Sequence, residues 1–358
     1  MCSTKVIGYW ISEKKRQKFN WLEFQNICKR DGFSLKIIDI NSNVESQGPI
    51  HVFLHKLTDV LAHAESGDQA AKEIITKVQG YIRKHPELLV IDPLENVKNL
   101  YNRQLSYEII RSELKFDEVF VPNSVEIQTS NEDQVLFLMK RNGIQFPCVC
   151  KPLFAHGSSD AHKMMIVFNE DGLKDCQTPY VAQNFINHNA ILYKLFIVDG
   201  RFHVVERPSL KNFYQRDCAS LKTIFFSSHD ISKSGSNSKW SIISEDDLHL
   251  GVKPKNEYFQ EISEQIVKIF GLILVGVDVV IENHTGKYAI IDVNVFPGYD
   301  GYPHFFEHLI ESIKKRLKSR KVYSKQNFNT ESSFKNSFSE DLDSGFESDE
   351  KKKQFSLS

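Results

Sequence analysis

The sequence predicts a mixed α/β fold, with an N-terminal α/β domain built on a parallel sheet and two following lobes built on antiparallel sheets. Three observations support this prediction. Over roughly the first hundred residues, apolar runs alternate with amphipathic helical segments, which is typical of a parallel sheet covered by helices. From Phe146 onward, short apolar runs follow one another through tight turns, as antiparallel strands do. A chain of 358 residues, 41% of them hydrophobic, is long enough to bury the cores of several such units.

The composition narrows the classes of function. The net charge of −1 provides no general positive surface for nucleic acid, so any anion site must come from a local cluster. The N-terminus has no apolar signal-peptide core, and the longest apolar run, Ile269 to Ile281, is too short to span a bilayer. The six cysteines form no CxxC pair, which favours reduced thiols. We therefore expect a cytoplasmic protein that neither binds nucleic acid nor inserts into a membrane.

The N-terminal elements follow from the spacing of apolar residues. We expect strands at residues 5–10, 35–40, 52–54 and 88–92, and helices at residues 17–30, at 70–84 and up to Tyr101. The first strand is followed by no GxGxxG, which disfavours a dinucleotide-binding fold. Four cations follow it instead, at a helix entrance where open α/β sheets bind ligands: Lys14, Lys15, Arg16 and Lys18. Any one of these cations fits a solvated helix start, but the four together favour an anion site.

The later elements are predicted in the same way. We expect strands at residues 147–151, 164–168, 179–186 and 223–228, a hairpin over 191–210 with Asp199 and Gly200 at its turn, and helices at 257–270 and 303–317. After Lys321 the chain is rich in Ser, Asn and charged residues without an apolar period, which predicts disorder. The expected domains are an N-terminal domain (1–112), a central lobe (113–190), a C-terminal lobe (191–322) and a disordered tail (323–358).

Residues 276–298 predict a β-hairpin, because two apolar runs flank a polar turn centred on Thr285. Its apolar strands contain Asp278, Asp292 and Asn294. Asp292 and Asn294 are two residues apart and share a face, and Asp278 lies opposite Asp292 unless the register slips by one residue. Each of the three taken alone fits a polar strand end that faces water. Three converging oxygen ligands favour Mg²⁺ held together with a substrate phosphate.

Two other segments fit a nucleotide. Lys151 ends an apolar strand before a loop of small residues, where a lysine and backbone N–H groups hold phosphate, although a lysine that caps a strand is the alternative. The strand end from Gln183 to Ile186 has backbone groups that suit an adenine edge, as many edge strands do. The hairpin that follows adds three cations and a hydroxyl: Lys194, Arg207, Ser209 and Lys211.

Five blocks in the chain carry a specific resemblance. They are Gly8 to Lys15 (GYWISEKK), His55 to Asp59 (HKLTD), Gln183 to Asn189 (QNFINHN), Arg207 to Phe213 (RPSLKNF) and Ile291 to Gly298 (IDVNVFPG). In this order, over roughly residues 5–318, the sequence resembles the inositol-tetrakisphosphate 1-kinases, also called inositol 1,3,4-trisphosphate 5/6-kinases, of the ATP-grasp superfamily. The resemblance implies an ATP-grasp fold that holds the nucleotide between two antiparallel sheets. It also implies ATP- and Mg²⁺-dependent phosphorylation of inositol tris- and tetrakisphosphates, and some members of the family move phosphate between inositol phosphates.

The resemblance also implies roles for individual residues. The implied ATP contacts are Arg103, Lys151, Gln183, Asn184, Phe185, Ile186, Ser209, Ser228 and Ser232. The implied inositol phosphate contacts are Lys15, His162, Lys194, Asn294 and Gly298, and the implied ligands of two Mg²⁺ ions are Asp278, Asp292 and Asn294. The catalytic set is Lys151, His162 and Asp292. Because family members differ by one residue in the length of the loop after Lys151, His156 is the alternative to His162.

Two other functions remain open at this point. An ATP-grasp carboxylate ligase shares the fold, but the many cations suit several phosphates better than one carboxylate. A catalytically inactive scaffold would lack a metal ligand or the nucleotide lysine, and all of these are present. The sequence marks no general base, since either His162 or an acidic metal ligand can take the proton. The expected partners are inositol polyphosphates and ATP or ADP, bound by a monomer.

Overall fold

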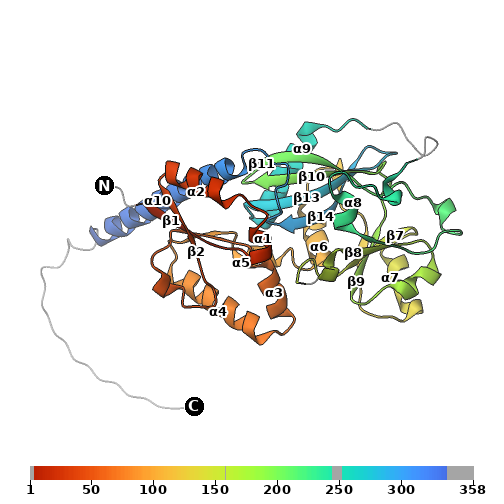
Figure 1. Ribbon diagram of the computed structural model, residues 1–358, viewed down its shortest axis with the longest axis horizontal. Helices are drawn as coiled ribbons and strands as arrows, with labels where there is room; N and C mark the ends of the chain where they lie inside the picture. Colours follow the sequence, from red (N-terminus) through yellow and green to blue (C-terminus); the bar gives the residue numbers. More distant parts are fainter. Residues whose placement is uncertain (1–3, 158, 244–251, 337–358) are drawn as a thin grey trace, which may run out of the picture. The chain divides into compact units, whose positions relative to one another are not determined.

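The computed structural model of the protein describes residues 4–157, 159–243 and 252–336 (Figure 1). Residues 1–313 form one compact unit, and the chain from residue 314 onward forms a second. The last helix, α10 (Phe305–Asn336), continues well past the end that the sequence predicts at residue 317. Residues 337–358 of the predicted tail lie outside the described residues.

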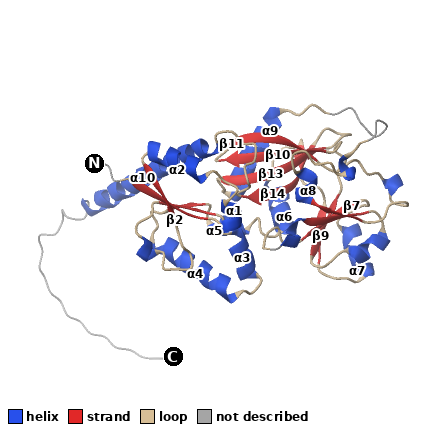
Figure 2. Cartoon of the chain, viewed as in Figure 1, coloured by secondary structure: helices blue, strands red, loops and turns tan. Residues whose placement is uncertain are grey.

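The N-terminal domain has the predicted parallel sheet, with strand order β2-β1-β3-β4. Figure 2 shows its strands in red with blue helices on both sides. Its strands are β1 (Lys5–Trp10), β2 (Phe33–Ile37), β3 (Val52–His55) and β4 (Leu89–Ile91). Its helices are α1 (Glu13–Arg16), α2 (Trp21–Arg30), α3 (Thr58–Glu65), α4 (Gln69–Lys84) and α5 (Leu94–Lys98). The alternation of strands and helices confirms the predicted α/β class.

Several details of this domain differ from the prediction. The strand expected at residues 35–40 lies instead at β2 (Phe33–Ile37). The helix expected at 17–30 begins only at Trp21, because the side chain of Asn20 caps it by accepting a hydrogen bond from the backbone N–H of Glu23 at 3.2 Å. The eight-residue helix α3 was not predicted, because so short a segment cannot show a helical period clearly. This helix carries Asp59, which lines the cavity described below.

The central sheet is antiparallel, with strand order β12-β8-β7-β9-β6. Its strands are β6 (Ser124–Ile127), β7 (Cys148–Pro152), β8 (Lys163–Val167), β9 (Tyr180–Asn184) and β12 (Ile224–Ser227). One face packs on α7 (Glu132–Arg141) in a core that contains the buried thiols of Cys148 and Cys150. The opposite face lines the cavity, as the presence of Val149, Lys151 and Gln183 in its wall shows.

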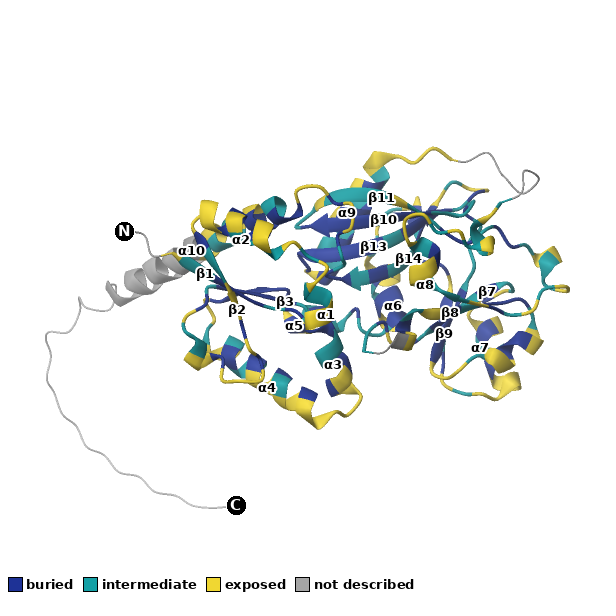
Figure 3. Cartoon of the chain, viewed as in Figure 1, coloured by how far each residue is buried: buried dark blue, intermediate teal, exposed yellow. Residues whose placement is uncertain are grey.

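The C-terminal sheet has strand order β11-β10-β13-β14-β5. It packs against α9 (Asn256–Phe270), which in turn contacts α6 (Arg103–Glu113). Its strands are β5 (Val119–Phe120), β10 (Ile191–Val198), β11 (Arg201–Pro208), β13 (Leu274–Ile281) and β14 (Tyr288–Val295). The predicted two-residue turn between β10 and β11 is confirmed, with φ angles of 51° at Asp199 and 87° at Gly200. Figure 3 shows that β10 and β13 are largely buried, whereas the edge strand β11 is only partly covered.

The two antiparallel sheets exchange strands. β5 precedes the central sheet in the chain but pairs with β14, whereas β12 follows β10 and β11 but pairs with β8. The sheets are thus not simple consecutive segments, and the domain boundaries at 112, 190 and 322 stay a prediction. The N-terminal domain is fixed to the C-terminal sheet by the buried Asp92 carboxylate, which accepts hydrogen bonds from the backbone N–H groups of Ile273 at 2.7 Å and Leu274 at 2.9 Å.

Candidate active site

A cavity of about 1060 Å³ is enclosed by the central sheet, the C-terminal sheet and the first turn of the N-terminal domain. Of the site residues predicted from the sequence, Arg16, Arg103 and Lys211 do not line it, and the others do. The lining set is Lys15, Lys151, His162, Gln183, Asn184, Phe185, Ile186, Lys194, Ser209, Ser228, Ser232, Asp278, Asp292, Asn294 and Gly298. Residues up to 283 positions apart, from Lys15 to Gly298 (298 − 15 = 283), therefore share one space.

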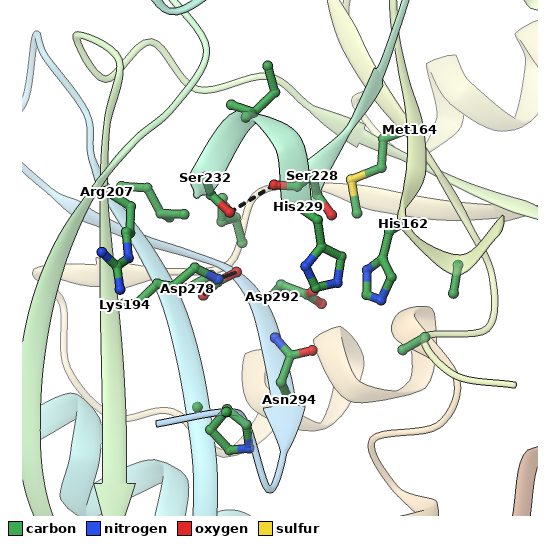
Figure 4. A pocket seen from close by; sticks show the side chains of 18 of the residues that line it. His162, Met164, Lys194, Arg207, Ser228, His229, Ser232, Asp278, Asp292 and Asn294 are labelled. Carbon is green, nitrogen blue, oxygen red and sulfur yellow. Dashed lines mark hydrogen bonds and ion pairs between the residues drawn. The ribbon is translucent and has the colours of Figure 1, made fainter. Parts of the chain in front are cut away.

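The predicted register of the acidic hairpin is present in the structure. Asp278 on β13 pairs with Asp292 on β14, and Gly276 pairs with Asn294. The three polar side chains all line the cavity (Figure 4), and the side chains of Asp278 and Asp292 are only 17% and 14% exposed. Two carboxylates and an amide oxygen thus converge on one face of an otherwise apolar hairpin.

A β-bulge lies immediately beside this pair. Beyond Asp278 the register shifts, so that Val279 pairs with Ile290 and Ile291 is left between the two pairs. The freed carbonyl of Ile291 accepts hydrogen bonds from the Lys151 ammonium at 2.6 Å and from the Tyr107 hydroxyl at 2.9 Å. The bulge therefore joins the hairpin to the lysine of the central sheet.

The charges of the site are closely balanced. Burial raises the pKa of Asp278, the nearby charge of Asp292 raises it further, and Lys194 opposes both. The Lys194 ammonium lies 3.1 Å and 3.2 Å from the two carboxylate oxygens of Asp278. Arg103 places its Nε 3.7 Å from Asp292 Oδ1. Two largely buried carboxylates thus face each other with a cation beside each.

The donor set fits Mg²⁺ that shares its coordination with a ligand. Within residues 4–157, 159–243 and 252–336, no cluster of three or more His, Cys, Asp or Glu side chains is arranged to hold a metal. Asp278, Asp292 and Asn294 provide only part of a coordination shell of hard oxygens. Mg²⁺ is commonly bound in this way, through one or two carboxylates, water and substrate phosphates, rather than in an all-protein cage.

Lys151 is buried on β7, with 4% of its surface exposed. Besides Ile291, its ammonium donates to Gln183 Oε1 at 2.7 Å and to the Tyr107 hydroxyl at 3.1 Å. Burial lowers the pKa of Lys151 to about 8, while Asp292 acts in the opposite direction. The sequence missed Tyr107, although its position four residues after Arg103 on α6 places both on one helix face.

Several residues that are predicted to contact the nucleotide form hydrogen bonds with other protein groups. The Asn184 side chain accepts a hydrogen bond from Gln145 N at 2.8 Å and donates one to Gly143 O at 3.0 Å, so it orders the loop before β7. The Ser209 hydroxyl lies 2.7 Å from His188 Nε2, and Ser232 Oγ donates to Ser228 O at 2.8 Å. In contrast, the buried Gln183 Nε2 has no hydrogen-bond partner among the described residues, so a donor is left at the cavity wall.

Arg103 lies behind the wall of the cavity rather than in it. It is 2% exposed, and its guanidinium donates to the carbonyls of Pro152, Phe154 and Ala161, the latter two at 3.2 Å and 3.1 Å. These carbonyls flank the loop that follows Lys151. In this structure Arg103 shapes that loop and faces Asp292, and its predicted contact with ATP stays a prediction.

Replacing Arg103 by Ala should destabilise the fold strongly. Loss of the guanidinium leaves three carbonyls and the Asp292 carboxylate without their buried donor, which costs about 3–5 kcal/mol of unfolding free energy. Urea unfolding followed by circular dichroism measures this loss. Arg111→Ala on the same helix is the matched control, because Arg111 is exposed and donates to Pro122 O and Ser124 Oγ; a loss of about 1 kcal/mol is expected there. Equal losses for the two variants would contradict this account of Arg103.

The other end of the cavity is cationic. Lys14, Lys15 and Lys18 line it as predicted, whereas Arg16 pairs with Glu13 at 2.6 Å and does not. Lys15 forms an ion pair with Asp59 at 2.6 Å. Other basic side chains that line the cavity are Lys56, Arg207 and Lys233. Burial, and then the charge of Lys15, lowers the pKa of Lys56 to about 7, so the charge of this lysine depends on an anion nearby.

Both candidate histidines line the cavity, at different places. His156 lies near Lys15 and Asp59, and its buried Nε2 has no hydrogen-bond partner among the described residues. His162 lies within electrostatic range of Asp292 and contacts the ring of His229, a residue that the sequence analysis missed. Burial lowers the pKa of His156 to about 3 and that of His162 to about 4, so both rings are neutral near pH 7. Which of the two contacts substrate stays a prediction.

A nucleotide-sized cavity between two antiparallel sheets, with a buried lysine on one and an acidic hairpin on the other, is the arrangement of the ATP-grasp class. Solved structures share this fold: D-cycloserine synthetase has a TM-score of 0.57 at 10% identity, covering 87% of this chain and 99% of that one. D-alanine–D-alanine ligase from Bacillus anthracis has a TM-score of 0.53 at 16% identity, covering 89% and 99%. Identities this low show the fold alone.

The sequence comparisons identify the family. Residues 114–315 match the inositol 1,3,4-trisphosphate 5/6-kinase ATP-grasp domain, and residues 6–97 match the pre-ATP-grasp domain of the same family. Inositol-tetrakisphosphate 1-kinase of Xenopus laevis is 39% identical over 314 residues, which cover 86% of this chain and 78% of that protein. The enzyme of the same name in Danio rerio is 38% identical, with coverage of 88% and 80%. The chain belongs to the inositol 1,3,4-trisphosphate 5/6-kinase family, as the five blocks predicted.

No helix among the described residues is both long enough and apolar enough to cross a membrane.

Proposed function

We propose that the protein is an ATP- and Mg²⁺-dependent inositol polyphosphate kinase. It would transfer the γ-phosphate of ATP to a hydroxyl of inositol tris- and tetrakisphosphates, as a 1,3,4-trisphosphate 5/6-kinase and a 3,4,5,6-tetrakisphosphate 1-kinase. The observation that carries the proposal is the single cavity with a cationic end, formed by Lys14, Lys15 and Lys18, and an acidic hairpin at Asp278 and Asp292. Family membership and the names of the relatives support it.

We assign Mg²⁺, with two ions expected, to Asp278, Asp292 and Asn294 together with phosphate oxygens of ATP. When bound, Mg²⁺ neutralises charge on the phosphate that is transferred. The support is the paired carboxylates across the β13–β14 ladder and the attraction that already draws the Lys194 ammonium to within 3.1 Å of Asp278. Lys194 would then be free to turn from Asp278 toward a phosphate of the acceptor.

ATP would lie between the central and C-terminal sheets. Lys151 would take up charge on its phosphates, with the ammonium held in place by Gln183 and the Ile291 carbonyl. The strand end from Gln183 to Ile186 would bind the adenine. Ser209, which follows β11, and two serines of α8 (Ser228–Ser232) would complete the nucleotide site: Ser228 and Ser232.

The acceptor would bind at the cationic end. Lys15, Lys194 and His162 would hold phosphates of the inositol ring, while Asn294 and Gly298 would lie beside the ring itself. These contacts would place one hydroxyl in line with the γ-phosphate, and phosphoryl transfer requires such positioning more than it requires a strong base. The pKa of His162, at about 4, suits hydrogen bonding better than proton abstraction at neutral pH.

Two features separate this proposal from an ATP-grasp carboxylate ligase. The cavity is lined by more cations than one carboxylate can engage, and the relatives at 38–39% identity are inositol phosphate kinases by name, whereas the ligase structures are 10–16% identical. The expectation of a cytoplasmic monomer rests on the sequence alone.

The proposal predicts turnover of specific acceptors. Purified protein with Mg²⁺ and ATP should convert inositol 1,3,4-trisphosphate and inositol 3,4,5,6-tetrakisphosphate to products with one more phosphate, resolved by anion-exchange chromatography. Unphosphorylated inositol is the control and should not react, because it offers the cationic end no charge to bind. Conversion of no member of a panel of inositol tris- and tetrakisphosphates would contradict the proposal.

A further inference from the structure

His162 and His229 form a ring pair in the wall of the cavity. Their ring centroids are 3.9 Å apart and their planes are inclined at 82°, so one ring presents its edge to the face of the other (Figure 4). Both residues line the cavity. His162 is within electrostatic range of Asp292, and His229 is within range of Lys194 and Asp278. The pair therefore lies beside the acidic hairpin, where the transferred phosphate is expected.

The strand pairing explains how residues 67 positions apart (229 − 162 = 67) meet. The antiparallel ladder of β8 and β12 ends with the pair of Lys163 and Ser227. His162 directly precedes β8, and His229 lies two residues beyond the end of β12. The end of the ladder thus fixes the distance between their backbones.

The two histidines differ in how firmly they are held. His229 lies in α8 (Ser228–Ser232), whose N-terminus is capped by the Ser227 hydroxyl and whose Ile231 is buried with 6% exposed. His162 ends a short 3-10 turn, η2 (Ser159–His162). Among the residues that the structure describes, the His162 ring has no hydrogen-bond partner, and the aromatic ring that it contacts is that of His229.

We infer that His229 is a positioning residue that holds the His162 ring in the orientation needed to contact the inositol phosphate. The inference rests on the proposed function and adds a residue that neither the sequence motifs nor the family resemblance assigned. An edge-to-face contact orients a ring through its shape and quadrupole and needs no particular charge on either partner. His229 would act on the acceptor through His162 and need not touch the nucleotide.

The variants His229→Phe and His229→Ala test this role. Phe keeps a ring that can contact His162 but removes both nitrogens, whereas Ala removes the ring. We expect His229→Ala to lower kcat/KM for the inositol phosphate roughly tenfold, through a higher KM for that substrate, while the KM for ATP stays unchanged. His229→Phe should remain within about threefold of the parent. Thermal unfolding of each variant shows whether a loss of activity reflects a loss of fold.

A double-mutant cycle gives the sharper result. If His229 acts through His162, then the kcat/KM of His162→Ala should equal that of the double variant His162→Ala, His229→Ala, because the positioned ring is already absent. Ser232→Ala, on the same helix, is the contrasting variant. Ser232 is a predicted ATP contact, so its loss should raise the KM for ATP instead.

The inference is overturned if His229→Phe is as impaired as His229→Ala, if the losses in the two single alanine variants multiply in the double variant, or if His229→Ala raises mainly the KM for ATP. Full activity of His162→Ala or of His229→Ala also overturns it. All these comparisons use a parent protein that turns over the inositol phosphate. Failure of the parent would contradict the proposed function itself, so the two failures are distinguishable.

Discussion

Asp292→Asn should lower turnover by roughly a thousandfold or more while the protein remains folded. Asp292 shares a face of the hairpin with Asn294 and lies opposite Asp278, so its carboxylate is the centre of the proposed metal site. The amide that replaces it has the same shape but lacks the charge that a divalent cation needs. Steady-state kinetics with ATP and an inositol tetrakisphosphate measure the loss, and circular dichroism checks the fold.

Asp300→Asn is the matched control for Asp292→Asn. Asp300 also carries an acidic side chain at the cavity wall, but it lies outside the hairpin and is exposed. Its replacement should leave kcat within about threefold of the parent. If Asp292→Asn kept near-normal turnover at saturating Mg²⁺, the assignment of the metal to the hairpin would be wrong.

Lys151→Met should lower kcat/KM for ATP by roughly 10²- to 10³-fold. The methionine fills a similar volume but brings no positive charge to the ATP phosphates. Its effect on stability should be modest, about 1–3 kcal/mol, because the buried Gln183 Oε1 loses its donor. The Ile291 carbonyl keeps its hydrogen bond from Tyr107. Binding of a fluorescent ATP analogue, measured beside the kinetics, locates the loss in the nucleotide site.

Lys163→Met provides the comparison for Lys151→Met. Lys163 lies on the adjacent strand β8, where its side chain is 74% exposed and pairs with Asp160 at 2.7 Å. An exposed ion pair of this kind contributes little, so the variant should bind and turn over ATP like the parent. Unchanged nucleotide affinity in Lys151→Met would exclude the proposed role of this lysine.

The hairpin was predictable from the sequence because the side-chain period of a strand is fixed. Asp292 and Asn294 had to share a face, and the polar turn indicated the register that pairs Asp278 with Asp292. The bulge was not predictable, because the hydrophobic pattern does not show which residue is left unpaired. That bulge frees the Ile291 carbonyl to accept a hydrogen bond from Lys151. This contact between the two sheets therefore could not be predicted from the sequence.

Residues whose roles depend on distant partners were the hardest to predict. The resemblance pointed to Arg103 as a nucleotide residue. Only the structure shows that its guanidinium donates to the carbonyls that flank the loop after Lys151. His229 carries no motif, and its contact with His162 arises from the end of the β8–β12 ladder. Long-range strand pairing of this kind is set by tertiary packing and leaves no local signal in the sequence.

The fate of the γ-phosphate tests the central claim most directly. The protein is incubated with Mg²⁺, γ-³²P-labelled ATP and inositol 3,4,5,6-tetrakisphosphate, and the label is followed by anion-exchange chromatography. A kinase that uses the cationic end for its acceptor should move the label into an inositol pentakisphosphate, with one ADP formed for each labelled product. Label released as inorganic phosphate, with the inositol phosphate unchanged, would contradict the proposed function.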